Sequence, residues 1–426
     1  MKKTYPLLIL FALLAWATSA AARIDIDITA AEMRKMPVAI PYFSNQGSPD
    51  KIEERGIRMA DLLGRALELH GFLKVIPAKS YGGGPQQDWR KIGAELTVQG
   101  QYSQEPDGLS LDIRLLDVAS GRTLLGKHYK STEAGERQAV LKFCDDAVLT
   151  LSGERGISQT SIAFVLEKDG VKEIAITDLL GDSFRQVTKH RRLALSPRFT
   201  PDGRFLSYTS YHRGNPNLYL TELSQDKVTR PISQRGGLNM APAWHPDGKT
   251  LAITLSPNGN AELFLLDRNG QILEQLTKEE GLNVSPSWSP DGSKLAFVSD
   301  RAGKPQIYVL DIKTRQVKRL TFEGQYNTTP AWSPKGDLIA YSGRHENQYQ
   351  IYVISPEGGS PTKLTKGPGD FESPSWSPDG RQIVFSRNLD GHTKIYAVFR
   401  NGSGQRLLFD GDGEESMPQW SPRPLE

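Results

Sequence analysis

The chain has 426 residues, more than one hydrophobic core normally supports, so the sequence predicts at least two domains. Its 52 lysines and arginines and 49 aspartates and glutamates give a formal net charge of +3. This argues against a nucleic-acid-binding protein, because such proteins normally carry a strongly basic surface. The single cysteine, Cys144, excludes an internal disulfide, so packed cores alone must hold the fold.

Residues 1–22 have the pattern of a secretory signal peptide. Lys2 and Lys3 precede an apolar run at 6–17 that is too short to span a bilayer, and small residues at 18–22 offer a cleavage site. No cysteine stands at that site, and no later stretch is apolar enough to cross a membrane. We therefore expect an exported, soluble protein without a lipid anchor.

Residues 23–36 begin with a short segment that alternates polar and apolar residues with a period of two, as a β-strand does. Two interpretations stay open. The segment is an edge strand of its own domain, or it is a free N-terminal strand that adds to the sheet of a partner protein.

Residues 37–152 predict a small α/β domain. A strand at 38–43 is followed by a helix at 49–70, for which Ser48 is the expected N-cap and Gly71 the expected stop. Further strands are expected at 72–77, 96–102, 109–118 and 123–129. A second amphipathic helix at 133–151 carries Cys144 on its apolar face, which predicts a buried, inert thiol.

The second half of the chain repeats one phrase, of the form Pro-x-Trp-Ser-Pro-Asp-Gly. We call its first residue the marker proline, and the copies recur at intervals of 44 or 45 residues. The marker prolines are Pro197, Pro242, Pro286, Pro330, Pro374 and Pro418. A fixed period of this length is typical of a repeat architecture.

Each repeat reads as four antiparallel strands, which is one blade of a β-propeller. A large aromatic residue follows two places after the marker proline, a Ser-Pro-Asp-Gly turn comes next, and a short apolar strand follows. The aromatic residues are Phe199, Trp244, Trp288, Trp332, Trp376 and Trp420. One such residue per unit is expected to fill the space between neighbouring blades.

The two ends of the repeat array complement each other. Residues 157–190 supply only the last three strands of a unit, and residues 417–422 supply only the missing first strand. We therefore predict a six-bladed β-propeller over residues 157–422, closed by the C-terminal strand and preceded by the small α/β domain.

The sequence carries no motif for catalysis or metal binding. The seven histidines lack metal-ligand spacing, no Gly-x-Ser-x-Gly occurs, and the one acidic cluster, at 410–415, lacks the spacing of a calcium loop. We therefore expect no enzyme activity, no catalytic residue, no cofactor and no metal.

The loops before the marker prolines differ between blades, while the Ser-Pro-Asp-Gly turns at the opposite face are nearly uniform. Asn239, Asn283 and Asn327 each stand three residues before a marker proline. Either these amides satisfy backbone groups of the loops, or they belong to a binding face, since variable loops on a fixed scaffold usually carry specificity.

Taken together, the signal peptide, the Arg-Ile-Asp-Ile-Asp segment, the α/β domain and the six repeats resemble the TolB family, the periplasmic component of the Tol-Pal system of Gram-negative bacteria. The resemblance covers essentially the whole chain after the signal peptide. It implies a non-enzymatic periplasmic relay that supports outer-membrane integrity and constriction during cell division.

The resemblance also implies two partner-binding regions. The peptidoglycan-associated lipoprotein Pal would bind the propeller at Leu238, Asn239, Met240, Ala241, Asn283, Val284, Ser285, Asn327 and Thr328. TolA would bind the N-terminal segment at Arg23, Ile24, Asp25, Ile26, Asp27 and Ile28. Other outer-membrane lipoproteins are further expected partners, whereas nucleic acid, direct membrane insertion and oligomerisation are not expected.

Two other functions stay open at this point. An exported propeller hydrolase or lyase would act on peptide or glycan substrates, although the chain lacks the catalytic partner domain of the propeller peptidases that it resembles. A carbohydrate-binding propeller would be retained on peptidoglycan in the absence of Pal.

Overall fold

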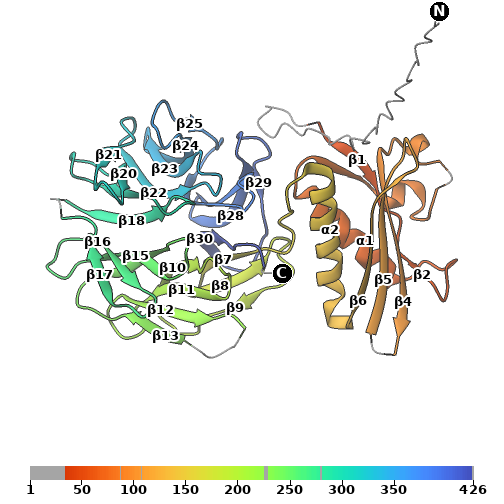
Figure 1. The fold of residues 1–426 in the computed structure, drawn as a ribbon, viewed down its shortest axis with the longest axis horizontal. Coiled ribbons are helices and arrows are strands. Elements are labelled where there is room, and N and C mark those ends of the chain that lie inside the picture. Colours follow the sequence, from red (N-terminus) through yellow and green to blue (C-terminus); the bar gives the residue numbers. More distant parts are fainter. Residues whose placement is uncertain (1–33, 87, 107, 225–228, 279–280, 425–426) are drawn as a thin grey trace, which may run out of the picture.

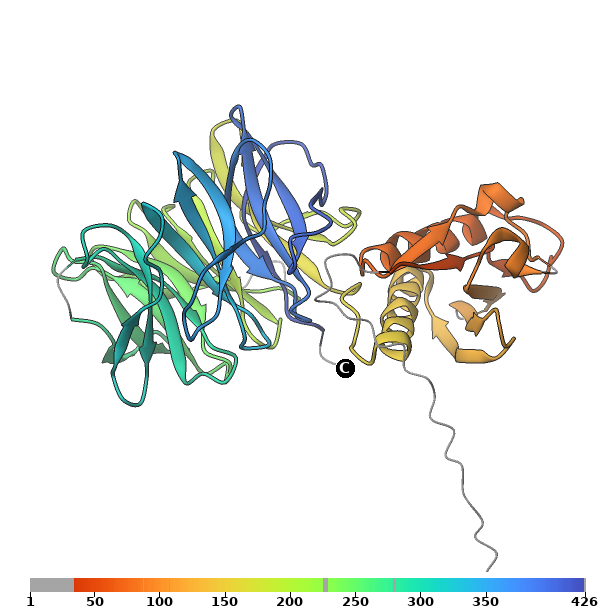
Figure 2. The ribbon, with the colours of Figure 1, turned by 90° about the horizontal axis from the view of Figure 1, so that it is seen from above.

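The computed structural model describes residues 34–86, 88–106, 108–224, 229–278 and 281–424. They form two lobes, an α/β domain and a ring of β-sheets, joined by a short linker (Figures 1 and 2). The predicted fold class, a six-bladed β-propeller preceded by an α/β domain, is confirmed. The signal peptide and residues 23–28 lie outside the described residues. None of the helices in the described ranges is both long and apolar enough to cross a membrane.

The α/β domain is built on one mixed sheet with the strand order β3-β1-β4-β5-β6, and β2 pairs with β4. Its strands are β1 (Met36–Ala39), β2 (Ser44–Asn45), β3 (Leu73–Ile76), β4 (Leu96–Glu105), β5 (Gly108–Asp117) and β6 (Thr123–Ser131). Three short 3-10 helices lie at Ala78–Tyr81, Trp89–Ile92 and Glu133–Gly135. β1 pairs in parallel with β3 and β4, while β4, β5 and β6 are antiparallel.

Two helices, α1 (Glu54–Glu68) and α2 (Glu136–Ser152), contribute buried faces to the core of this domain. α1 buries Met59, Leu63 and Leu67, which recur every four residues and so share one helix face. α2 buries Cys144, which is 0% exposed, so its predicted burial is confirmed, and burial raises the pKa of its thiol.

The expected start of the first helix at residue 49 is wrong, because α1 begins at Glu54. Long-range contacts hold the preceding segment in another conformation. Asn45 lies in β2, and the Glu53 carboxylate accepts hydrogen bonds from its amide at 3.1 Å and from the Tyr102 hydroxyl at 2.6 Å. A Ser48-Pro49 pair favours a helix start locally, but these contacts with β4 override that preference.

The propeller consists, in the described part of the chain, of six four-stranded antiparallel sheets. The first blade contains β30 (Glu414–Trp420), β7 (Ser161–Lys168), β8 (Val171–Asp178) and β9 (Arg185–Gln186). The second contains β10 (Ala194–Phe199), β11 (Phe205–Ser210), β12 (Asn217–Glu222) and β13 (Thr229–Ser233). The third contains β14 (Asn239–Trp244), β15 (Thr250–Leu255), β16 (Glu262–Asp267) and β17 (Ile272–Gln275).

The remaining three blades have the same order. The fourth contains β18 (Asn283–Trp288), β19 (Lys294–Ser299), β20 (Gln306–Asp311) and β21 (Val317–Arg319). The fifth contains β22 (Tyr326–Trp332), β23 (Ile339–His345), β24 (Gln348–Ile354) and β25 (Thr362–Lys363). The sixth contains β26 (Asp370–Trp376), β27 (Gln382–Leu389), β28 (His392–Phe399) and β29 (Arg406–Leu407).

The ring is closed by pairing the last strand of the chain with the first strand of the propeller. β30 lies antiparallel to β7, with Trp420 opposite Ile162. The Trp420 indole nitrogen donates to the Thr160 hydroxyl at 2.8 Å, across 260 positions of sequence. The two incomplete repeats therefore form one blade, in which β30 pairs with the otherwise unpaired edge of β7.

The α/β domain packs on one side of the propeller through the ends of its two helices. Arg65 of α1 and Arg137 of α2 both form ion pairs with Asp182, at 2.9 Å each. Gly71, which follows α1 with φ +81°, lies against the Phe399 ring, where a Cβ would approach to 2.2 Å. This close approach, as well as the left-handed backbone, requires glycine at position 71.

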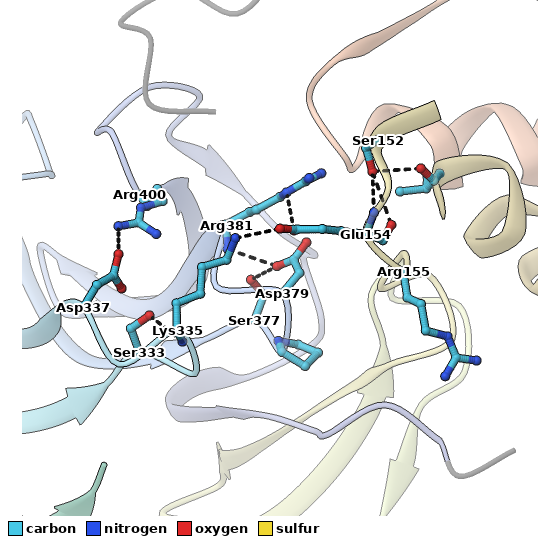
Figure 3. Close-up of polar contacts among 12 residues, drawn as sticks. Ser152, Glu154, Arg155, Ser333, Lys335, Asp337, Ser377, Asp379, Arg381 and Arg400 are labelled. Carbon is cyan, nitrogen blue, oxygen red and sulfur yellow. Dashed lines mark hydrogen bonds and ion pairs between the residues drawn. The ribbon is translucent and has the colours of Figure 1, made fainter. Parts of the chain in front are cut away.

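Ion pairs attach the linker between the two domains to the propeller (Figure 3). The Glu154 carboxylate lies 2.9 Å from the Lys335 ammonium and 3.1 Å from the Arg381 Nε. Lys335 and Arg381 belong to the Ser-Pro-x-Gly turn regions of the fifth and sixth blades. The linker is thus held against the end of the propeller that carries these turns, which we call the turn face.

Candidate binding face and axial channel

The residues implicated in Pal binding lie at the end of the propeller opposite the turn face. We call this end the rim face, and it consists of the connections into each first strand together with the starts of those strands. Because all blades have the same strand order, the starts of β14, β18 and β22 lie at the same end of the ring. The structure therefore brings the three implicated groups together on neighbouring blades.

The three asparagines of this set have completely buried side chains. Asn239 donates to the Arg235 carbonyl at 2.7 Å, and Asn283 accepts from the Arg301 guanidinium at 2.6 Å. Asn327 donates to one side chain and one backbone carbonyl, at 2.8 and 2.7 Å. Of the two interpretations, the structure favours the one in which these amides brace the rim loops. Partly exposed positions such as Leu238, Met240, Val284, Ser285 and Thr328 remain available for contact.

Sequence reasoning missed two exposed apolar residues of the rim face, Leu282 and Tyr326, which are 47% and 36% exposed. They occupy the place four residues before the marker proline. Around the ring, that place is filled by Leu193, Leu238, Leu282, Tyr326, Asp370 and Glu414. It is apolar in four consecutive blades and acidic in the other two. This difference between apolar and acidic residues at one repeat position is visible in the sequence and could have indicated these exposed residues.

The residue directly before each marker proline has a left-handed backbone, with φ between 49° and 57°. These residues are Ser196, Ala241, Ser285, Thr329, Ser373 and Met417. The pairing of the first and second strands shifts register at the same place in every blade. Such bulges re-aim neighbouring side chains and are common beside binding sites. Ala241 and Ser285, both implicated in Pal binding, are held in this conformation.

The acidic segment at 410–415 divides its carboxylates among separate partners. Asp410 pairs with Lys394 at 2.9 Å, and Asp412 pairs with Lys168 at 2.6 Å. Glu415 is 1% exposed, and burial raises its pKa to about 7 although Lys394 opposes the shift. The geometry therefore explains the cluster by ion pairing and burial.

The axis of the propeller contains a cavity of about 420 Å³ toward the turn face. Each turn region contributes one proline to the lining of this cavity: Pro201, Pro246, Pro290, Pro334, Pro378 and Pro422. The repeat aromatics also contribute to the lining. Among the described residues that line this cavity, Arg198 is the only charged one. We call this cavity the axial channel.

A buried polar group lies where the two domains join. Ser158 of the linker places its hydroxyl 3.1 Å from the His70 Nε2 and 3.1 Å from the Cys144 sulfur. Asp145 accepts the backbone N–H of Ser158 at 2.7 Å. His70, Cys144 and Asp145 are also, among the described residues, the grouping whose ligand atoms lie close enough to hold a metal. Their hydrogen bonds to the linker already explain the arrangement as a domain joint.

Comparison with known proteins adds to this geometry. Residues 148–424 match the family described as the TolB beta propeller domain, and residues 24–124 match the TolB amino-terminal domain. A Tol-Pal system protein TolB from Desulfotalea psychrophila is 45% identical over 220 residues, which cover 52% of this chain and 50% of that relative. The TolB relative from Desulfosudis oleivorans is 36% identical over 257 residues, 58% of each chain. The chain thus spans about half the length of these two relatives.

Similarity to a solved structure extends across both domains. The crystal structure of TolB from Acinetobacter baumannii superimposes with a TM-score of 0.81 and 28% sequence identity. The match covers 91% of this chain and 97% of that one. With the propeller family matched over more than half of its residues and the amino-terminal family matched before it, the chain belongs to the TolB family.

Proposed function

We propose that the protein is a non-enzymatic relay of the Tol-Pal system in the periplasm, which binds Pal on the rim face and TolA through residues 23–28. Membership of the TolB family supports a role in this system. The observation that supports the assignment of the rim face is the presence of exposed apolar residues on a rigid scaffold, among them Leu282 and Tyr326, which are 47% and 36% exposed.

The rim face has the features of a protein-binding surface. The residues four places before the marker proline are apolar on four consecutive blades. The buried asparagines hold the loops in one conformation, which lowers the entropy lost on binding. Acidic residues at Asp370 and Glu414 complete the ring and would orient a partner by charge.

The test is a pull-down and a titration with purified Pal. We expect Leu282→Asp to weaken Pal binding by about thirtyfold, since removing a central apolar contact commonly costs about 2 kcal/mol. Leu273→Asp is the matched control, because Leu273 is 50% exposed but lies on β17, the last strand of the third blade. Equal Pal binding by the parent chain and by both variants would remove the rim face as the Pal site.

The proposed TolA site is tested separately. A mature chain that begins at residue 29 should lose TolA and keep Pal, since the two sites are on different parts of the chain. Retention of TolA by this shortened chain would contradict the assignment of residues 23–28. Fractionation of cells that express the full chain tests the proposed periplasmic location.

A further inference from the structure

Arg198 departs from the repeat in the axial channel. It follows the first marker proline directly. The residues at the same place in the other blades are Ala243, Ser287, Ala331, Ser375 and Gln419. All five are uncharged and four are small. One blade therefore puts a long cationic side chain where the others leave space.

The guanidinium of Arg198 has no acidic partner among the residues that the structure describes. The one hydrogen bond that it makes to a described residue joins its Nη1 to the Pro197 carbonyl at 2.9 Å, which leaves its other N–H groups free to donate. Burial lowers the pKa of Arg198 to about 10, and no neighbouring carboxylate counteracts that effect. The side chain is still protonated at neutral pH, so this partly buried part of the channel holds a positive charge without a carboxylate partner among the described residues.

Two further donors line the same cavity. The hydroxyl oxygens of Ser287 and Ser375 accept the backbone N–H groups of Trp332 and Trp420, each at 3.0 Å. Each hydroxyl hydrogen is left to donate to another acceptor. The rest of the lining is largely proline and tryptophan, with small polar residues between them. The cavity thus combines one cation and hydroxyl donors with an apolar wall.

We propose that the axial channel binds a small organic monocarboxylate, whose carboxylate pairs with the Arg198 guanidinium and whose apolar part lies among the prolines and tryptophans. One positive charge is balanced by one negative charge, which favours a monoanion over a phosphate dianion. Arginine presents paired N–H groups that match the two oxygens of a carboxylate. A volume of about 420 Å³ also lies within the range of small-molecule sites.

The experiment is isothermal titration of the chain without its signal peptide, with sodium benzoate as the probe and benzamide as its neutral counterpart. We expect saturable 1:1 binding of benzoate, and binding of benzamide and phosphate at least about tenfold weaker. Arg198→Met should weaken benzoate binding by at least about thirtyfold, because it removes the only charge in the described lining. Arg198→Lys keeps the charge but not the paired geometry and should be intermediate.

Arg204→Met is the matched control, since Arg204 lies outside the axial-channel lining and pairs with Glu222 at 3.6 Å. It should bind benzoate as the parent chain does. Circular dichroism checks that Arg198→Met is folded, and the comparison of benzoate with benzamide tests the charge without any substitution. Equal binding of these two compounds, unchanged benzoate binding by a folded Arg198→Met, or no saturable benzoate binding would each overturn the proposal.

A last arm distinguishes the source of the carboxylate. Trialanine with a free carboxyl terminus is compared with amidated trialanine. Binding of the free acid only, more tightly than benzoate, identifies a peptide terminus as the ligand. Binding of benzoate but of neither peptide identifies a free small acid. Either result supports the site, and neither depends on Pal or TolA, so failure here leaves the proposed relay function untouched.

Discussion

The carboxylate of Glu154, in the linker, lies 2.9 Å from the ammonium of Lys335 on the propeller (Figure 3). Burial alone would raise the pKa of Glu154, but the hydrogen bond from Lys335 and the charge of Arg381 together lower it. Arg381 is 8% exposed and depends on this carboxylate for compensation. The ion pairs of Glu154 with Lys335 and Arg381 therefore hold the linker against the propeller.

Replacing this carboxylate should loosen the domain junction. We expect Glu154→Gln to lower the free energy of unfolding by about 1 kcal/mol, between the values typical of exposed and buried ion pairs. Urea unfolding measures the loss, and limited proteolysis at residues 153–160 should become faster. Arg58→Gln is the control, because its pair with Glu54 is exposed and worth less than about 0.5 kcal/mol. Equal losses in the two variants would contradict a special role for Glu154.

The closing strand makes Trp420 a critical residue of the ring. Trp420→Ala should cost about 3–5 kcal/mol, since it removes a buried tryptophan between the first and last blades. Trp420→Phe keeps much of the packing and loses the hydrogen bond to Thr160, so we expect about 1 kcal/mol. Thermal and denaturant unfolding measure both, with the exposed Leu407→Ala as a near-neutral control. A loss for Trp420→Ala no larger than for the control would show that closure does not stabilise the ring.

His70 should make the protein less stable in acid. Burial lowers its pKa to about 4, below the value of about 6.5 expected in the unfolded chain. The unfolded state therefore binds the proton more readily, and the stabilisation present above pH 6.5 is lost as the pH falls toward 4. His70→Gln should reduce the loss of unfolding free energy between pH 7.5 and pH 5. The stability of the His70→Gln variant at pH 7.5 shows separately how much the substitution disturbs the packing. An unchanged pH slope would contradict a neutral buried imidazole.

Glu415 should act in the opposite direction. Burial raises its pKa to about 7, above the ordinary value of 4.5. The folded state therefore holds the proton more tightly, and stability present below pH 4.5 is lost as the pH rises through 7. Glu415→Gln, which is similar in shape and neutral, should become more stable relative to the parent chain as the pH rises from 5 to 7.5. Denaturant midpoints at several pH values measure this, and a constant difference would rule out the ionisation of Glu415 as its cause.

Much of the architecture is predictable because its signals are local and repeated. Each Ser-Pro-Asp-Gly turn specifies a hairpin by its own residues, and the period of the tryptophans gives the blade length. The start of α1 was not predictable, because Asn45 and Tyr102 determine it through contacts that are distant in sequence. The features of the rim face were only partly predictable from the sequence. Asn239 and Asn283 can be recognised in the sequence by their fixed distance from the marker prolines, but their burial depends on neighbouring loops. Leu282 and Arg198 can be recognised when the residues at equivalent positions of the repeats are compared.

The pairing of β30 with β7 also determines when the first blade can be completed during synthesis. During synthesis, five blades acquire their strands in turn, but the first blade lacks its inner strand until residues 414–420 have been made. Until then the blades can form only an open crescent with unpaired edges, which promote aggregation. A premature stop or a proteolytic cut near the C-terminus leaves that crescent permanently open. Completion of the first blade therefore depends on the synthesis and retention of residues 414–420.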